Sequence, residues 1–391
     1  MIAANKFLFI EQALEQRNQA HQLRGMYPFE PQNTVQGVRG DRQLINFSSN
    51  DYLGLSKHPL LIEMAQDYTQ KYGTGATASR LVTGTYSIHQ NLEQQLAESC
   101  GYEAALLFNS GFQANSTILP TLLDRSSLVL CDRLVHNSLL QGIQASRARF
   151  IRYRHNDLQH LETLLVQSAE KSYSRILIVS ETVFSMDGDR SDIDALVQLA
   201  QSHNAILYLD DAHAFGVLGK TGMGLAADRA GIDIVINTFG KAFGTFGAFV
   251  ACSQQVRDYL VNYCPGFIYT TSLPPAVIGA ITAALNLVPT LESERHYLTQ
   301  QATNLRVELQ RLNYNTGQSN SQIVPLILGS EEKTLHLSQW LETRGVLAIA
   351  IRPPTVAAGT ARLRFALSSQ HTPQHLDQLI SLIREWHESQ S

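Results

Sequence analysis

Polar side chains capable of chemistry follow five short apolar segments of this 391-residue chain. In chain order they are Asn109-Ser110-Gly111-Phe112, Asp132 with His136, Glu181 with Ser185, Asp210-Asp211-Ala212-His213, and Asn237-Thr238-Phe239-Gly240-Lys241. Ligands of open parallel sheets bind outside the carboxyl ends of the strands. One polar residue at a strand end is common, because strands lead into loops. Five such groups together predict a functional site at one edge of a sheet.

Lys241 is the candidate nucleophile of this set. It follows a predicted buried strand, lies between Gly240 and Gly244, and has mainly apolar neighbours. Desolvation there would lower the pKa of the amine and allow it to form a Schiff base. A lone lysine is more often an exposed surface residue. Asp210 favours the functional interpretation, since a carboxylate on an adjacent strand can keep the pyridine nitrogen of a Schiff-base cofactor protonated.

Other interpretations compete at each of these positions. Asp210, Asp211 and His213 could together bind a divalent cation, but no second ligand cluster completes the set, so we predict no metal. The Asn109 to Phe112 segment opens a helix directly after a strand, where free backbone amides favour a phosphate. A simple N-cap at Ser110 is the alternative. His136 taken alone would be interpreted as a partly buried histidine without a catalytic role.

Two nucleotide-binding motifs are incomplete. Gly219-Lys220-Thr221 resembles the end of a P-loop, but Ala214 stands where the upstream glycine is required. Gly222-Met223-Gly224 with Ala227 resembles a dinucleotide fingerprint, yet it begins about a dozen residues after the preceding predicted strand. A nucleotide hydrolase or a dehydrogenase is therefore disfavoured.

The elements that must position these residues alternate along the chain. From residue 50 to 288, short apolar runs alternate with longer helical stretches, which predicts an α/β fold with a mostly parallel sheet and helices on both faces. The expected strands are Ala104–Phe108, Leu128–Cys131, Ile176–Ser180, Ala205–Leu209, Ile232–Ile236 and Ala248–Cys252. We expect a large ligand-binding domain over these residues.

The two ends of the chain show different patterns. Residues 1–49 predict an N-terminal arm, with a helix up to about Arg24 and a short strand at Leu44–Phe47. Residues 289–391 predict a smaller C-terminal α/β domain. Its expected elements are a helix to Leu312, strand Ile323–Leu328, helix Thr334–Arg344, strands Leu347–Ile351 and Arg362–Leu367, and a last helix that begins at Pro373 with Thr372 as N-cap.

The composition excludes some classes of partner. Thirty Lys and Arg residues against 34 Asp and Glu residues give a net charge of −4 without a basic block, so neither nucleic acid nor an anionic membrane is an expected partner. Charged residues make up only 16% of the chain, against about 25% in typical proteins. This shortage predicts an extra buried surface shared with another subunit.

Cysteine usage and apolar runs bear on the compartment. Cys100, Cys131, Cys252 and Cys264 form no C-x-x-C pair, which favours free thiols in a reducing compartment. There is no apolar run of about 18 residues and no signal-peptide core. We expect an unprocessed cytoplasmic protein.

Four motifs of the chain resemble the α-oxoamine synthases, which are pyridoxal-phosphate enzymes of fold type I. The motifs are Asn46-Phe47-Ser48-Ser49-Asn50-Asp51-Tyr52-Leu53-Gly54, Glu181-Thr182-Val183-Phe184-Ser185-Met186-Asp187-Gly188, Asp210-Asp211-Ala212-His213 and Thr238-Phe239-Gly240-Lys241. They occur in the family's order, and the resemblance extends from about Arg24 to the last predicted helix. It implies pyridoxal 5'-phosphate as cofactor.

The resemblance also implies a cofactor-binding role for individual residues. Lys241 would carry the cofactor, Asp210 would pair with its pyridine nitrogen, and His136 would stack on its ring. The further cofactor positions are His213 and Ser185 at the phenolic oxygen, the Gly111 and Phe112 amides with Thr238 at the phosphate, and Thr270 and Thr271, which reach the phosphate from the other subunit of a homodimer.

The same resemblance implies substrate-binding positions. These are Arg24, Asn50, His136, Thr355 and Arg364. Arg364 is the expected carboxylate clamp, because the planar guanidinium fork binds carboxylates through two hydrogen bonds.

The C-terminal stretch narrows the expected activity. Ile351-Arg352-Pro353-Pro354-Thr355-Val356 and Gly359-Thr360-Ala361-Arg362-Leu363-Arg364 resemble the biotin-pathway branch, which condenses L-alanine with a pimeloyl thioester of coenzyme A or acyl carrier protein. Ala214-Phe215 departs from the Gly-Thr or Gly-Ser pair often found in that branch and predicts a bulkier residue beside the cofactor. A sister synthase that uses glycine or serine with another acyl thioester, and a cofactor-binding protein without catalysis, remain alternatives.

Overall fold

The computed structural model describes residues 6–389, which divide into two compact units. The sheet unit comprises residues 50–185 and 189–299, and the terminal unit comprises residues 6–49, 186–188 and 300–389. The division falls within the long helix α11 (Glu292–Arg311). The expected domain limits at residues 49/50 and 288/289 stay a prediction.

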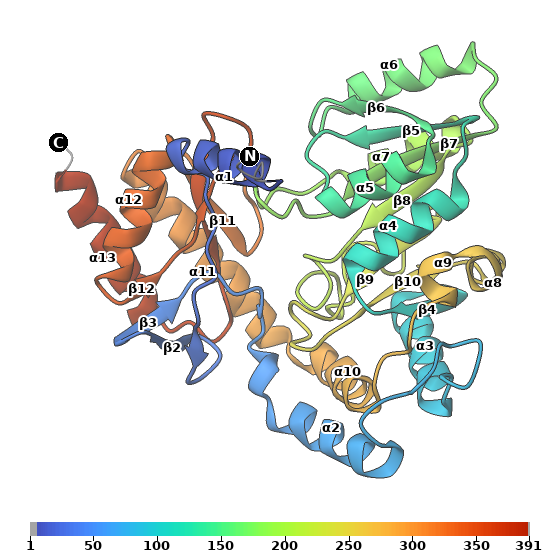
Figure 1. The fold of residues 1–391 in the computed structure, drawn as a ribbon, viewed down its shortest axis with the longest axis horizontal. Helices are drawn as coiled ribbons and strands as arrows, with labels where there is room; N and C mark the ends of the chain where they lie inside the picture. The colour runs from blue at the N-terminus through green and yellow to red at the C-terminus, as the bar shows by residue number, and fades with distance from the viewer. Residues whose placement is uncertain (1–5, 390–391) are drawn as a thin grey trace, which may run out of the picture. The chain divides into compact units, whose positions relative to one another are not determined.

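A seven-stranded sheet forms the centre of the sheet unit (Figure 1), in the order β4-β10-β9-β8-β7-β5-β6. The strands are β4 (Ala104–Phe108), β5 (Ser127–Asp132), β6 (Arg149–Tyr153), β7 (Arg175–Glu181), β8 (Ile206–Asp210), β9 (Ile234–Thr238) and β10 (Ala248–Cys252). Strand β10 runs antiparallel to β4 and β9, and the pairs that join β9, β8, β7, β5 and β6 are parallel. The prediction of a mostly parallel sheet is therefore confirmed.

Helices cover this sheet, and every residue of β4, β5 and β10 is buried. The helices are α2 (Pro59–Tyr72), α3 (Ser87–Cys100), α4 (Gly111–Leu122), α5 (Asn137–Ser146), α6 (Leu158–Ala169), α7 (Ile193–Ser202), α8 (Gln254–Tyr263), α9 (Pro265–Ile268) and α10 (Pro275–Leu287), with the 3-10 turns η1 (Leu55–Lys57) and η2 (Val288–Thr290). Burial of both faces explains why the strands appear in the sequence as continuous apolar runs. The predicted helical cover on both faces of the sheet agrees with this burial.

Side-chain caps define where several of these helices begin. The Ser110 hydroxyl accepts the Gln113 amide at 3.1 Å, and the Asp157 carboxylate accepts the His160 amide at 2.8 Å. Such a cap satisfies one backbone donor that has no partner inside the helix. The alternative interpretation of Ser110 as an N-cap is thus correct, and it is compatible with a phosphate at the following amides.

In the seven-stranded sheet, one expected strand is shifted by two residues and one strand was not predicted. The expected strand Ile232–Ile236 lies at Ile234–Thr238, so that Thr238 ends the strand. Strand β6 was not predicted, because it lies at the edge of the sheet and its residues are mostly exposed or half-buried, with arginines at positions 149 and 152. Charged edge strands lack the apolar pattern of central strands.

The terminal unit contains two small sheets, with orders β1-β2-β3-β12 and β11-β14-β13. Their strands are β1 (Glu30–Pro31), β2 (Gln36–Arg39), β3 (Arg42–Asn46), β11 (Ile323–Gly329), β12 (Val346–Leu347), β13 (Ala350–Ile351) and β14 (Ala361–Ala366), and the helices are α1 (Leu8–Gln19), α12 (Glu331–Glu342), α13 (Pro373–Ser389) and the end of α11. The N-terminal residues thus complete a sheet with a C-terminal strand, because β3 pairs with β12.

The single expected strand Leu347–Ile351 was wrong. Its two ends belong to different sheets, since β12 pairs with β3 and β13 pairs with β14. Side chains bind the intervening backbone: the Ile349 amide donates to the Ser48 hydroxyl at 2.9 Å, and the Ser338 hydroxyl donates to the Ala348 carbonyl at 2.6 Å. A continuous ladder cannot form where side chains occupy these groups.

Within residues 6–389, no single helix is long and apolar enough to cross a membrane. One bent pair of helical segments, Pro275–Thr290 with Glu292–Arg311, passes the same test of length and composition. Most of the apolar residues of α10 are buried in the sheet unit.

Candidate active site

The carboxyl ends of adjacent strands in the sheet unit place acidic residues in a row. Glu181 at the end of β7 is paired in register with Asp210 at the end of β8, and Asp132 ends the next strand, β5. Their alignment follows from the parallel pairing, which brings like ends of strands to one edge. The predicted edge therefore exists.

Asp210 is held in a fixed orientation by a helix residue. Its Oδ2 accepts a hydrogen bond from Asn115 Nδ2 at 2.8 Å, and its Oδ1 accepts the Ala212 amide at 3.1 Å. The Tyr208 hydroxyl in turn donates to Asn115 Oδ1 at 2.8 Å. Asp210 is only 8% exposed, so little solvent reaches its carboxylate and this network orients it.

His213 forms a second network in the sheet unit. Its Nδ1 lies 2.7 Å from the hydroxyl of Tyr52, and this hydroxyl donates its proton to Asn50 Oδ1 at 3.1 Å. Tyr52 is fully buried. The structure thus connects His213 with Asn50, a predicted substrate residue, through a phenol to which the sequence analysis assigned no role.

His136 caps helix α5 and lies within the field of two site residues. Its Nδ1 accepts the Ser138 amide at 3.2 Å and lies 2.8 Å from the Ser138 hydroxyl. Burial lowers the pKa of His136, the charge of Asp210 raises it, and the charge of Lys241 lowers it further. His136, Asp210 and Lys241 are therefore close enough to interact, as predicted, and burial favours the neutral imidazole.

Glu181 is a buried residue of the site to which the sequence analysis gave no role. It is 2% exposed, and its Oε1 accepts the backbone amide of His136 at 2.5 Å. Burial and then repulsion from Asp210 raise the pKa of Glu181 well above its usual value, against the opposing charge of Lys241. Its sequence signals were its position directly after an apolar run and its place at the start of a family motif, whereas Asn115 on α4 had none.

A tight loop between β9 and β10 positions Lys241. The Gly244 amide donates to the Lys241 carbonyl at 2.8 Å, and the Phe239 amide donates to the Gly247 carbonyl at 2.9 Å. Gly244 has φ +64, which a residue with a side chain rarely adopts. The loop is anchored by Phe239 and Phe243, which are fully buried.

Phe215 belongs to the aromatic core beneath this loop. It is fully buried and stacks on Phe243 with ring centroids 4.2 Å apart, and it also contacts Phe239 and Phe249. Its bulk therefore fills core volume. The expectation that it also lies beside the cofactor stays a prediction.

The start of α4 and the end of β9 form a cradle suited to an anion. Thr238 Oγ1 is buried and has no hydrogen-bond partner among residues 6–389. A Cβ added at Gly111 would come 2.5 Å from Thr238 Cγ2, so the close approach requires glycine. The first amides of a helix, here those of Gly111 and Phe112, lack intrahelical partners and attract phosphate. An unpaired hydroxyl beside free amides fits the predicted phosphate position.

The described residues offer no alternative metal centre. No group of three or more His, Cys, Asp or Glu side chains in the described part of the chain could hold a metal ion. Asp211 points into the core, where it accepts hydrogen bonds from the Thr182 hydroxyl and the Ala226 amide, and burial raises its pKa to about 7.

Comparison with known proteins identifies the family. The family model for aminotransferase class I and II matches residues 42–383. The chain belongs to the aminotransferase class I and II family. The predicted fold class is thereby confirmed.

Individual members of this family are similar over nearly the whole chain. The 8-amino-7-oxononanoate synthase of Gluconacetobacter diazotrophicus is 49% identical over 384 residues, which are 96% of this chain and 96% of that protein. A serine palmitoyltransferase variant from S. paucimobilis, solved with bound PLP-myriocin aldimine, has a TM-score of 0.91 at 26% identity and covers 100% of this chain and 99% of its own. The 8-amino-7-oxononanoate synthase of Francisella tularensis has a TM-score of 0.77 at 28% identity and covers 89% of this chain and 98% of its own.

The remaining predicted residues of this aminotransferase-family chain lie in both units. Ser185 is buried in the loop after β7. In the same chain, Gln113 Nε2 donates to Thr270 Oγ1 at 2.7 Å and Asn109 Nδ2 donates to the Thr271 carbonyl at 3.0 Å. Both threonines thus lie near the start of α4, and their expected contribution to a partner subunit stays a prediction.

Three predicted substrate residues lie in the terminal unit of the aminotransferase-family chain. Arg24 donates to the Thr355 hydroxyl at 2.8 Å. Arg364 lies on β14 and is buried. Their substrate roles stay predictions.

Proposed function

We propose that the protein is a pyridoxal-phosphate enzyme that condenses L-alanine with a pimeloyl thioester to give 8-amino-7-oxononanoate, CO2 and a free thiol. The observation that carries this proposal is the 49% identity over 384 residues to a protein named for this activity. The arrangement of Lys241, Asp210, His213 and His136 supports it, because each has a function in this chemistry.

Pyridoxal phosphate supplies an electron sink that stabilises negative charge at the Cα of the amino acid. Asp210 would keep the pyridine nitrogen protonated, with its carboxylate aligned by Asn115. His213 and Ser185 would bind the phenolic oxygen. Thr238 with the Gly111 and Phe112 amides would bind the phosphate. These assignments rest on the cradle at the start of α4 and on the hydrogen-bond networks of Asp210 and His213, which all lie in the sheet unit.

The protein's own side chains would also handle the protons and charges of the reaction. The Lys241 amine is the proposed base for the Cα proton, since its loop places it within the field of His136 and Glu181. His136 would donate a hydrogen bond to the oxyanion that develops on the thioester carbonyl. Arg364 would bind a substrate carboxylate through its guanidinium fork.

The substitution Lys241→Ala tests the proposal. It removes both the attachment of the cofactor and the base, so we expect loss of the visible absorbance of the cofactor and loss of turnover. Lys171→Ala, an exposed lysine of the sheet unit, is the matched control. A Lys241→Ala enzyme with full activity would contradict the assignment.

The alternative of a sister activity is not favoured, because the relative that is 49% identical over 384 residues is named 8-amino-7-oxononanoate synthase, whereas the serine palmitoyltransferase is only 26% identical. A panel of alanine, glycine and serine against several acyl thioesters, followed by thiol and CO2 release, separates the two. Preference for glycine or serine would favour the sister activity. Binding of the cofactor without release from any pair would favour a protein without catalysis.

We also propose that the enzyme is a cytoplasmic homodimer. All four cysteines are free and buried, which agrees with a reducing compartment. The central part of a large subunit interface is typically depleted of charged residues. The low share of charged residues in this chain, 16%, supports such an interface here.

A further inference from the structure

A cavity of about 860 Å³ in the terminal unit has a lining rich in arginine. It lies among the residues that follow α1, strands β2 and β3, helix α12 and the segment after β12. Its charged lining comprises the carboxylate Glu342 and the four arginines Arg24, Arg39, Arg42 and Arg352. The formal charges, four positive and one negative, leave an excess of three positive charges.

Glu342 neutralises only part of this charge. It pairs with Arg39 at 3.2 Å and with Arg42 at 3.7 Å. Arg24 donates instead to the neutral Thr355 hydroxyl at 2.8 Å, and Arg352 donates to the Leu23 carbonyl at 3.3 Å. Neither of these two guanidiniums has a carboxylate at ion-pair distance within residues 6–389.

Two of the arginines, Arg39 and Arg352, are also partly withdrawn from water. The Arg39 side chain is 18% exposed, and its Nε is buried without a hydrogen-bond partner in the described part of the chain. Its guanidinium is held 5.6 Å from the centroid of the Tyr27 ring. Burial, and then repulsion from Arg24, lowers the pKa of Arg352. The cavity therefore contains positive charge and a free donor that an anion would satisfy.

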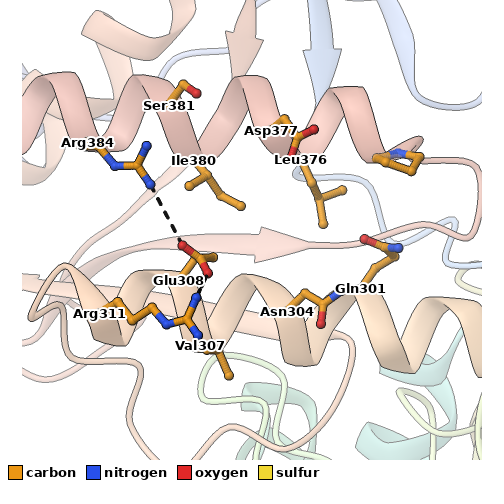
Figure 2. A pocket seen from close by; sticks show the side chains of 11 residues that line it. Gln301, Asn304, Val307, Glu308, Arg311, Leu376, Asp377, Ile380, Ser381 and Arg384 are labelled. Carbon is orange, nitrogen blue, oxygen red and sulfur yellow. Dashed lines mark hydrogen bonds and ion pairs between the residues drawn. The ribbon is translucent and has the colours of Figure 1, made fainter.

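The groove between α11 and α13 shows the opposite arrangement (Figure 2). It has a volume of about 540 Å³ and is lined by Arg311 and Arg384, but both pair with Glu308, and Asp377 adds a second carboxylate. Its charges balance. Excess positive charge thus distinguishes the arginine cavity from another hollow of the same unit.

We propose that the arginine cavity binds the phosphate groups of a phosphopantetheine-bearing ligand. Guanidinium forks bind phosphate oxygens through paired, charge-assisted hydrogen bonds. The positive charge of the cavity rests on the structure alone. The identity of the ligand rests on the proposed function, in which the acyl donor is a thioester of the phosphopantetheine arm. Coenzyme A and acyl carrier protein share the arm, so both are sources of the phosphate.

Binding of inorganic pyrophosphate to the holoenzyme, measured by calorimetry, tests the site without turnover. Loss of a charge-assisted hydrogen bond in Arg39→Gln or Arg42→Gln should weaken binding about tenfold, and added salt should weaken it further. Arg311→Gln, from the balanced groove, should leave the affinity unchanged. Pyrophosphate that does not bind, or binds equally to all four proteins, would overturn the proposal.

The variant Glu342→Gln gives a result in the opposite direction. It removes the one carboxylate among the described residues that line the cavity, so it should tighten pyrophosphate binding several-fold. A misfolded variant cannot produce tighter binding. Unchanged or weaker binding by Glu342→Gln would contradict the proposal.

Kinetics with the two donors identify the ligand. One donor is an acyl-coenzyme A and the other is an acylated acyl carrier protein. For the donor that the cavity binds, Arg39→Gln should raise KM about tenfold without changing kcat. Unchanged KM for both would overturn the ligand assignment and leave the proposed function intact. If the enzyme catalyses no condensation but pyrophosphate binding still depends on the arginines, the proposed function is contradicted and the anion site stays valid.

Discussion

At the scale of residues, the geometry of Asp210 depends on Asn115, a side chain that does not itself need to touch the cofactor. Asn115 connects the Asp210 carboxylate with the Tyr208 hydroxyl through hydrogen bonds of 2.8 Å. A buried carboxylate without this donor would lose a charge-assisted hydrogen bond and its fixed orientation. Asn115 is therefore a positioning residue for the proposed nitrogen partner.

The substitution Asn115→Ala should reduce kcat. A hydrogen bond to a charged group contributes about 1.5–3 kcal/mol, which corresponds to a reduction of roughly 10-fold to 100-fold. Steady-state kinetics with the visible cofactor spectrum provide the measurement, and Asn262→Ala, at an exposed position of α8, is the control. An Asn115→Ala enzyme with normal kcat and spectrum would show that Asp210 needs no such support.

At the scale of elements, one histidine joins the loops that follow three strands. His155, which follows β6, lies 3.0 Å from Asp132 at the end of β5 and 2.7 Å from Asp189 in the loop after β7. Asn156 also donates to Asp189 at 2.7 Å. His136 follows Asp132 by four residues, so these contacts help to hold the loop that carries it.

This cluster predicts a dependence of stability on pH. Burial alone would lower the pKa of His155, but its hydrogen bonds to Asp132 and Asp189 outweigh burial and raise the pKa to about 10, against about 6.5 in an unfolded chain. The folded state then binds the proton more tightly. The stabilisation is complete below about pH 6.5 and is lost progressively as the pH rises to about 10.

Urea unfolding of the natural protein and of His155→Gln at a series of pH values measures this effect. The difference between their midpoints should be largest near neutral pH or below and should shrink towards about pH 10. His203→Gln, at the end of α7, is the control. A difference that stays constant over this range would mean that His155 contributes no proton-linked stability.

At the scale of the whole molecule, the proposed dimer gives a reason for the low charged share of 16%. Interfaces are depleted of charged residues at their cores. Thr270 and Thr271 lie beside the start of α4 in their own chain, and the family resemblance assigns them to the phosphate of the other subunit. These assignments require active sites shared between subunits.

Mixing two inactive variants tests shared sites. A heterodimer of Lys241→Ala with Thr270→Ala/Thr271→Ala contains one intact site if the threonines act on the partner, so subunit exchange should restore about a quarter of the natural activity. Light scattering provides the mass. A monomeric enzyme with full activity, or exchanged dimers without recovery, would contradict the shared site.

Much of the sheet unit could be predicted, because its strands are buried on both faces and form continuous apolar runs. Strands β4 and β10 match their predicted limits. Strand β6 was missed because its exposed edge carries arginines, and Leu347–Ile351 was wrong because Ser48 and Ser338 bind its backbone. Neither contact has a local signal in the sequence.

The sequence by itself predicted a site at one edge of the sheet from residue type and position after a strand, and the family resemblance implied the roles of Lys241, Asp210, His136 and His213, which stay predictions. Only the tertiary structure brought Asn115 to Asp210, Tyr52 to His213 and Glu181 to the amide of His136. It alone gathered the arginines of the terminal-unit cavity from distant segments. The physical reason is that hydrogen bonds and charge balance depend on distances between atoms, and the packing of elements distant in the chain sets those distances.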